Sequence, residues 1–98
     1  MTMFEPNTSE EVRYNEKKKI AIEEAESYGY AGEKRRRFVI GELAVWSKGL
    51  KFLFRDEELN LTDDEKNSVI KRVSKVIKGE LAIDTQESAE EYVRSILD

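Results

Sequence analysis

Cysteine and histidine are both absent from this chain of 98 residues. Without cysteine the protein has no thiol nucleophile and no disulfide, and without histidine it lacks the side chain that most often acts as a general base or binds a transition metal. No glycine-rich phosphate loop and no calcium-loop spacing occurs either. We therefore expect no enzymatic activity, no catalytic residues, no cofactor and no metal site.

Long apolar runs are also missing, and there is a single proline. No stretch has the length and apolar character of a membrane span, and the first residues, MTMFEPNTSEE, are too acidic for a secretory signal. The sequence therefore predicts a cytoplasmic protein without membrane association.

Charged residues make up 39% of the chain and hydrophobic residues another 39%, with a formal net charge of −4. This composition is polar, but it is not rich in the glycine and proline typical of disordered linkers. We expect a single helical domain over residues 1–98, in which residues 1–8 form a flexible N-terminal tail.

Four segments are predicted to be helices, namely residues 9–28, 33–55, 63–78 and 85–97. Three of them begin with the spacing of a capping box, in which a side chain and an amide three residues apart bond to each other. The three pairs are Thr8 with Glu11, Thr62 with Glu65, and Asp84 with Glu87. Three glycines that can adopt a left-handed conformation are predicted to end helices: Gly29, Gly32 and Gly79.

Residues 33–55 carry the strongest helical periodicity. Large apolar side chains recur there at alternating steps of four and three, at Val39, Leu43, Trp46, Leu50 and Leu53. This pattern predicts one long core helix and an all-α fold, a small bundle of three to four amphipathic helices. The alternative is an α+β fold in which the helix breaks at Gly49 and the segments LKFLF and ELAI pair as a short two-stranded element.

The later segments show shorter apolar seams, with Val69, Val73 and Val76 in residues 63–78 and Ala89, Val93 and Ile96 in residues 85–97. The first segment is patterned more weakly. We expect it to pack loosely or against a partner chain.

Residues 33–55 hold more apolar bulk than the core of a small bundle needs. We expect the following side chains to form the core or an apolar interface: Phe38, Trp46, Leu50, Phe52, Leu53 and Phe54. This surplus predicts docking of a partner protein or formation of a homodimer.

Basic residues gather in two blocks, 34–55 and 66–78, and the first block overlaps the apolar segment just described. Such blocks are usually solvated faces, but they could also form one positive surface that attracts phosphate or an acidic protein. The tentative binding residues for a partner or an anion are Tyr28, Tyr30, Arg35, Arg36, Arg37, Lys48, Lys51, Arg55, Lys71, Arg72 and Lys75. A helix projected back from Phe38 puts Arg35 and Arg36 on its apolar side, so we expect them in a loop or beyond the end of the bundle.

These patterns favour a non-catalytic protein–protein interaction module, such as a small inhibitor, adaptor or assembly factor that acts through a helical face. The alternative is a nucleic-acid-binding regulator that uses the two basic blocks. The overall plan resembles that of many small phage accessory proteins and four-helix immunity proteins, although no motif is diagnostic of either.

Overall fold

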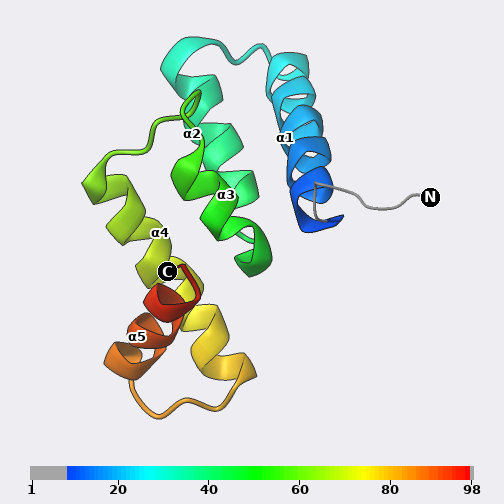
Figure 1. Ribbon diagram of the computed structural model, residues 1–98. Helices are drawn as coiled ribbons and strands as arrows, with labels where there is room; N and C mark the ends of the chain where they lie inside the picture. Colours follow the sequence, from blue (N-terminus) through cyan, green and yellow to red (C-terminus); the bar gives the residue numbers. More distant parts are fainter. Residues whose placement is uncertain (1–8, 98) are drawn as a thin grey trace, which may run out of the picture. The chain divides into compact units, whose positions relative to one another are not determined.

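The computed structural model describes residues 9–97, and Figure 1 shows their secondary structure. The elements are α1 (Ser9–Ser27), α2 (Gly32–Leu43), the short 3-10 helix η1 (Ser47–Gly49), α3 (Leu50–Arg55), α4 (Asp63–Glu80) and α5 (Gln86–Leu97). No strand occurs among residues 9–97, which confirms the all-α prediction. The α+β alternative is wrong, because LKFLF lies in α3 and ELAI forms the end of α4 and the following turn. The predicted tail and the Thr8 cap lie outside the described residues.

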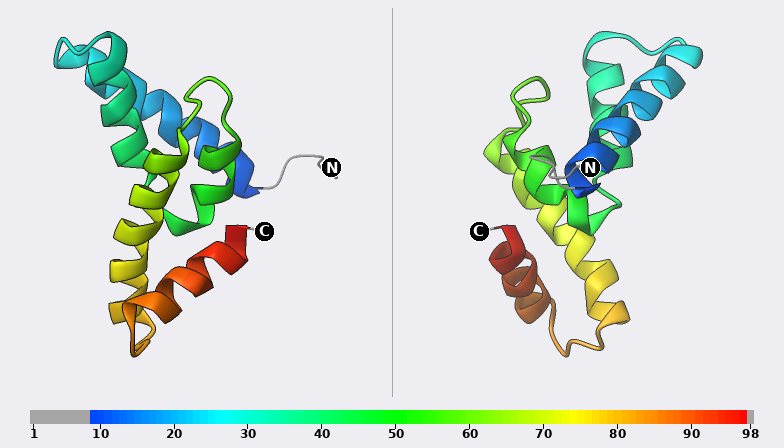
Figure 2. Two further views of the ribbon diagram at one scale, coloured as in Figure 1. Left: turned by 90° about the vertical axis from the view of Figure 1, so that its left-hand side faces the viewer. Right: turned by 45° about the vertical axis from the view of Figure 1, so that its right-hand side comes forward.

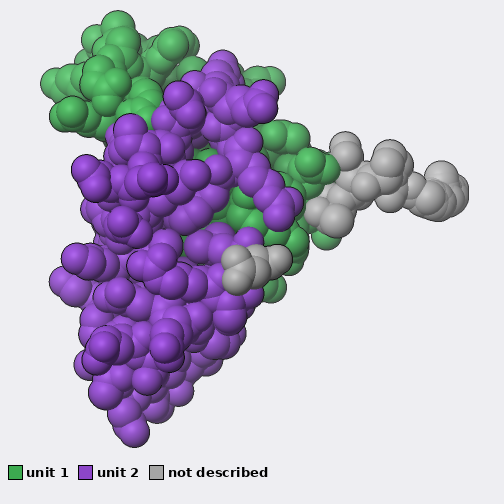
Figure 3. All heavy atoms as spheres, turned by 60° about the vertical axis from the view of Figure 1, so that its left-hand side comes forward, with its two compact units in different colours: residues 1–53 green, residues 54–98 purple. Residues whose placement is uncertain are grey.

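The chain divides into two compact units, residues 1–53 and 54–98, which are coloured separately in Figure 3. The division falls inside α3. The single domain inferred from the chain length stays a prediction, and the two units are described here one at a time.

In the first unit, α1 packs against α2 and η1, and Figure 2 shows α1 and α2 as a helical hairpin. The buried face of α1 carries Tyr14, Ala21 and Ala25, and the two alanines leave room for a close neighbouring helix. The chain reverses between the helices at Gly29 and Gly32, whose φ angles are 81° and 60°. Both glycines have the predicted left-handed backbone, which strongly favours glycine. Gly29 follows the end of α1 as predicted, whereas Gly32 begins α2 instead of ending a helix.

The prediction of one helix over residues 33–55 is wrong. α2 ends at Leu43, and Trp46 has extended backbone with φ −111° and ψ 103° before η1 begins. Buried side chains nevertheless include Val39, Leu43, Leu50 and Leu53, four of the five residues of the predicted seam. The interruption positions the Trp46 indole directly over Gly49, where no side chain blocks it.

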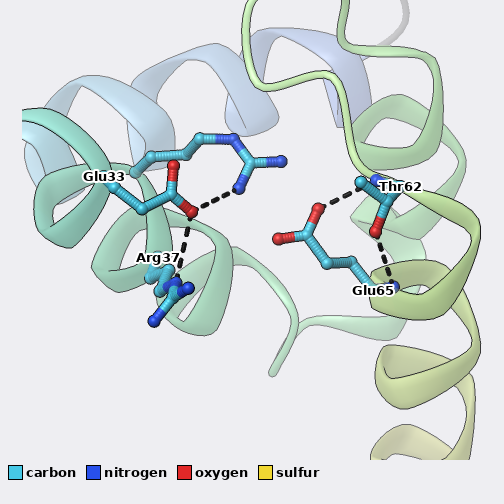
Figure 4. A network of polar contacts seen from close by, with 5 residues as sticks. Glu33, Arg37, Thr62 and Glu65 are labelled. Carbon is cyan, nitrogen blue, oxygen red and sulfur yellow. Dashed lines mark hydrogen bonds and ion pairs between the residues drawn. The ribbon is translucent and has the colours of Figure 1, made fainter.

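In the second unit, α4 and α5 form another helical hairpin (Figure 2). The predicted capping box at the start of α4 is confirmed: the Glu65 amide donates to Thr62 Oγ1 at 3.1 Å, and the Thr62 amide donates to Glu65 Oε1 at 2.8 Å (Figure 4). This cap satisfies two backbone amides and fixes where α4 begins.

The core of the second unit contains Val69, Val73 and Val93. Two predicted seam residues are instead exposed, Ile96 at 41% and Val76 at 58%. At about 100° per residue Val76 lies roughly 60° around α4 from Val73, on the side away from the buried Ile77. The predicted seam of α4 therefore leaves the buried face at its last step, the three residues from Val73 to Val76.

The turn between α4 and α5 also differs from the prediction. Gly79 does not end α4, which continues to Glu80, and the left-handed residue is Ala82 with φ 54°. The amide of Ile83 donates to the Lys78 carbonyl at 3.0 Å and so closes the end of the helix.

The predicted capping pair of Asp84 and Glu87 is wrong as well. The Ser88 amide donates to Thr85 Oγ1 at 3.0 Å, so α5 is capped one residue later than predicted. Threonine and aspartate are both good cap residues, and here the hydroxyl of Thr85 reaches the amide three residues ahead.

The loop from α3 to α4 is held by Asp56, whose Oδ1 accepts from the amides of Glu58 at 3.0 Å and Leu59 at 3.1 Å. Asn60 follows with φ 47°, a conformation that asparagine tolerates well. Across residues 9–97, none of the helices combines the length and the apolar character needed to cross a membrane.

Candidate interaction site

Three aromatic rings meet at the turn between α1 and α2. The ring centres of Tyr28 and Tyr30 are 5.5 Å apart, and Phe38 lies 5.9 Å from Tyr28 and 5.6 Å from Tyr30. Phe38 approaches both tyrosines edge to face, at 79° and 67°, which is a favourable arrangement for aromatic rings. We call Tyr28, Tyr30 and Phe38 the aromatic cluster.

The local sequence explains why these rings meet. Gly29 takes the left-handed conformation between the two tyrosines, and the Tyr30 amide donates to the Ala25 carbonyl at 3.0 Å. This turn holds both tyrosines at the end of α1, while Phe38 stands on the second turn of α2. The aromatic cluster is therefore set by backbone geometry at a tight helix connection.

The aromatic cluster is open to solvent. Tyr28 is 58% exposed, whereas Tyr30 and Phe38 are half-buried. The Tyr28 hydroxyl donates to Glu24 Oε2 at 3.5 Å. An exposed ring supported by two further rings presents a firm apolar surface with a polar edge.

Cations border the aromatic cluster. Lys34 Nζ lies 4.4 Å from the centre of the Tyr30 ring, within cation–π range. Arg35 Nη1 lies 2.7 Å from Glu26 Oε2 and so joins α2 to the end of α1. Lys34 therefore borders the aromatic cluster directly, and Arg35 pairs with a residue two positions before Tyr28.

The loop position expected for Arg35 and Arg36 is wrong, because α2 begins at Gly32 and includes them. Their extension beyond the end of the bundle stays a prediction. The helix accommodates their charge through ion pairs. Arg36 Nη1 lies 3.0 Å from Glu33 Oε2, and Arg37 Nε lies 3.2 Å from the same oxygen (Figure 4). The Arg36 side chain is only 22% exposed, whereas that of Arg37 is 75% exposed. A pair as exposed as that of Arg37 contributes about 0 to 1 kcal/mol, so a partner can compete for this arginine.

The other predicted basic residues fall in two units. Lys48 and Lys51 belong to the first unit, where Lys51 Nζ lies 5.3 Å from the Phe52 ring centre. The second unit contains Arg55, Lys71, Arg72 and Lys75. One continuous positive surface formed by all of them stays a prediction.

α4 carries an exposed basic stripe, which we define as Lys71, Arg72 and Lys75. Unlike Arg35, Arg36 and Arg37, none of the three has a carboxylate oxygen within 4.0 Å among the described residues. These charges are therefore available to an anion without the loss of an internal ion pair.

The predicted apolar residues divide between core and partly exposed positions. Leu50 and Leu53 are fully buried and belong to the core. The half-buried members contact other side chains: Phe52 lies 5.8 Å from Tyr14, and Trp46 lies 5.3 Å from Lys17 Nζ, measured to ring centres. Phe54 lies in the second unit, at 6.0 Å from Lys66 Nζ.

Lys34 was missed by sequence reasoning, although a signal existed. It begins the predicted basic block 34–55, although it was not among the tentative binding residues; helical spacing does not explain its contact, because Tyr30 lies before the start of α2. The contact between Tyr28 and Phe38 had no such signal, because it depends on how the chain reverses at Gly29.

Comparisons with known proteins add no functional information. The chain matches no protein-family model, no curated protein and no solved structure. Within residues 9–97, no three acidic side chains gather closely enough to hold a metal ion. The function must therefore be argued from the surfaces described above.

Proposed function

We propose that this protein is a non-catalytic interaction module that binds a protein partner through the aromatic cluster and the arginines beside it. The observation that carries the proposal is the exposure of Tyr28, at 58%, on top of two further rings. Tyrosine and arginine are enriched among the residues that dominate binding energy at protein interfaces. A rigid aromatic group also loses little conformational entropy when it is buried by a partner.

The charge beside the rings favours a partner with acidic side chains. Arg35 and Arg37 can exchange their exposed pairs with Glu26 and Glu33 for carboxylates of a partner. Such an exchange keeps the arginines paired while the rings become buried. The proposal includes a cytoplasmic location and a role as a small inhibitor, adaptor or assembly factor, as in the phage accessory proteins that the sequence plan resembles.

The test uses a photo-crosslinking amino acid at position 28, with position 92 as the matched control. Tyr92 is also an exposed tyrosine, but it lies on α5 in the second unit. We expect crosslinks to one cellular protein from position 28 and not from position 92. Tyr28→Ala should then weaken binding of that protein at least about tenfold, whereas Tyr92→Ala should not. Equal crosslinking from both positions would contradict the proposal.

A second candidate function, nucleic-acid binding, is favoured by the basic stripe of α4, which has no ion pair with any of residues 9–97. Three cations on one helix can neutralise phosphates, and binding of that kind weakens steeply with salt. The test is fluorescence anisotropy with a labelled DNA duplex at 50 mM and 200 mM salt. Lys71→Glu combined with Lys75→Glu should abolish binding, and binding that is insensitive to salt would reject this function.

A further inference from the structure

The second unit contains an open groove of about 520 Å³, bordered by the end of α3, the first turns of α4 and the last turn of α5. Its apolar lining consists of Phe54, Ile70 and Leu97. Ile70 is buried, whereas Phe54 and Leu97 are half-buried. The volume is within the range of sites that hold small ligands or side chains of a partner.

The groove follows from the register of the two helices. Asp63, Lys66 and Ile70 stand at steps of three and four on α4, which places them on one face. Arg94 and Leu97 stand three apart on α5. The capping box of Thr62 and Glu65 fixes the start of α4 at Asp63, which is the first α4 residue that lines the groove.

Two cations line this apolar groove. Neither Lys66 nor Arg94 has a carboxylate oxygen within 4.0 Å among the described residues. Lys66 Nζ lies 6.0 Å from the centre of the Phe54 ring, so the charge is held beside the apolar lining. Asp63 also lines the groove, which leaves a net charge of one positive unit from the two cations and this acid.

We propose that the groove binds a segment of a partner protein in which one acidic residue is flanked by leucine-sized side chains. The apolar side chains would contact Phe54 and Ile70, and the carboxylate would pair with Lys66 and Arg94. Asp63 disfavours a second carboxylate near the start of α4. This site is independent of the aromatic cluster, because it lies in the other unit.

The probe is the capped peptide acetyl-Leu-Glu-Leu-amide, and acetyl-Leu-Gln-Leu-amide is its uncharged control. Amide chemical shifts of the isotope-labelled full chain are followed by NMR during titration. We expect shifts in residues 63–70 and 94–97 and a dissociation constant on the order of 1 mM, as fits a short peptide in an open site. The glutamine peptide should bind at least about fivefold more weakly, because it cannot pair with the two cations.

Three variants locate the binding. Lys66→Glu and Arg94→Glu should each weaken binding of the glutamate peptide at least about fivefold. Lys75→Glu is the matched control, since nine residues at about 100° each place Lys75 on the opposite face of α4 from Lys66. It changes the net charge equally and should leave the affinity unchanged.

Circular dichroism checks that each variant is folded, and Lys66→Gln and Arg94→Gln replace any variant that is not. Three results would overturn the proposal. The first is the absence of amide shift changes at 10 mM peptide, and the second is equal affinity for both peptides. The third is a loss of affinity in Lys75→Glu as large as that in Lys66→Glu.

Discussion

Gly49 lies so close to the indole of Trp46 that a Cβ atom on residue 49 would stand 2.5 Å from Trp46 Cε3 and 2.9 Å from Cζ3. The indole is rigid, and Gly49 itself is buried. Glycine is therefore required here by packing, since its backbone does not have a positive φ. This contact marks the point at which the long periodic segment stops being one helix.

Gly49→Ala should destabilise the protein by about 1 to 3 kcal/mol through overpacking. Trp46→Ala should cost about 2 to 4 kcal/mol, somewhat less than for a fully buried tryptophan. In the Trp46→Ala background, Gly49→Ala should become nearly neutral, because the clashing ring is gone. Urea unfolding of the four proteins measures this coupling, and additive effects would contradict it.

The cap at the start of α5 gives a test with a neighbouring control. Thr85→Ala should lower the free energy of unfolding by about 1 kcal/mol, because the Ser88 amide loses its acceptor. Asp84→Ala should change it by less than about 0.5 kcal/mol. Denaturant unfolding separates the two, and a larger loss for Asp84→Ala would move the cap back to residue 84.

Ala82→Gly should stabilise the protein by about 0.5 to 1 kcal/mol. Ala82 has φ 54°, a conformation that is strained for alanine and open to glycine. Asn60→Gly provides the comparison, since asparagine already tolerates its φ of 47°. Thermal unfolding should show a higher melting temperature for Ala82→Gly alone, and a lower one would mean that this turn is not strained.

Replacing Arg35, Arg36 and Arg37 together by glutamate should change the stability by no more than about 1 to 2 kcal/mol. The pairs of Arg35 and Arg37 are exposed and that of Arg36 is half-buried, and acidic residues near a helix N-terminus recover part of the loss. Binding of the partner should weaken at least about tenfold. Loss of the fold in this variant would show that the three arginines stabilise the fold, and they would then no longer be part of the proposed interface.

Self-association stays a prediction, but the exposed apolar residues that support it differ from those expected from the sequence. Most of the apolar seam of residues 33–55 is buried, whereas Val45 is 79% exposed and Ile20 is 62% exposed. Sedimentation at micromolar concentration should reveal a dimer, and Val45→Glu should shift it toward monomer. A single species of 11.4 kDa would contradict the prediction.

The sequence predicted the helices best where local chemistry decides the structure. The capping box of Thr62 and Glu65 depends on residues three apart, and both of its hydrogen bonds form. Gly29 and Gly32 were also predictable, because few residues other than glycine adopt their backbone conformation readily. In each case the information lies within one turn of chain.

The prediction failed where packing overrides local preference. The periodicity through Trp46 is helical, but a ring that packs on Gly49 favours extended backbone at position 46. The pair of Arg35 and Glu26 joins residues on two helices, so no helical spacing encodes it. The groove beside Lys66 depends on how α5 lies against α4, and sequence periodicity carries no such information.

Trp46 is the only tryptophan in the chain, and its ring lies 5.3 Å from Lys17 Nζ within the first unit. Its fluorescence therefore reports on α1 and the turn after α2, while the second unit contributes no tryptophan signal. Far-UV circular dichroism, by contrast, reports on the helices of both units. Coincidence of the two melting curves would mean that one cooperative transition unfolds both units, and separate curves would mean that each unit unfolds by itself.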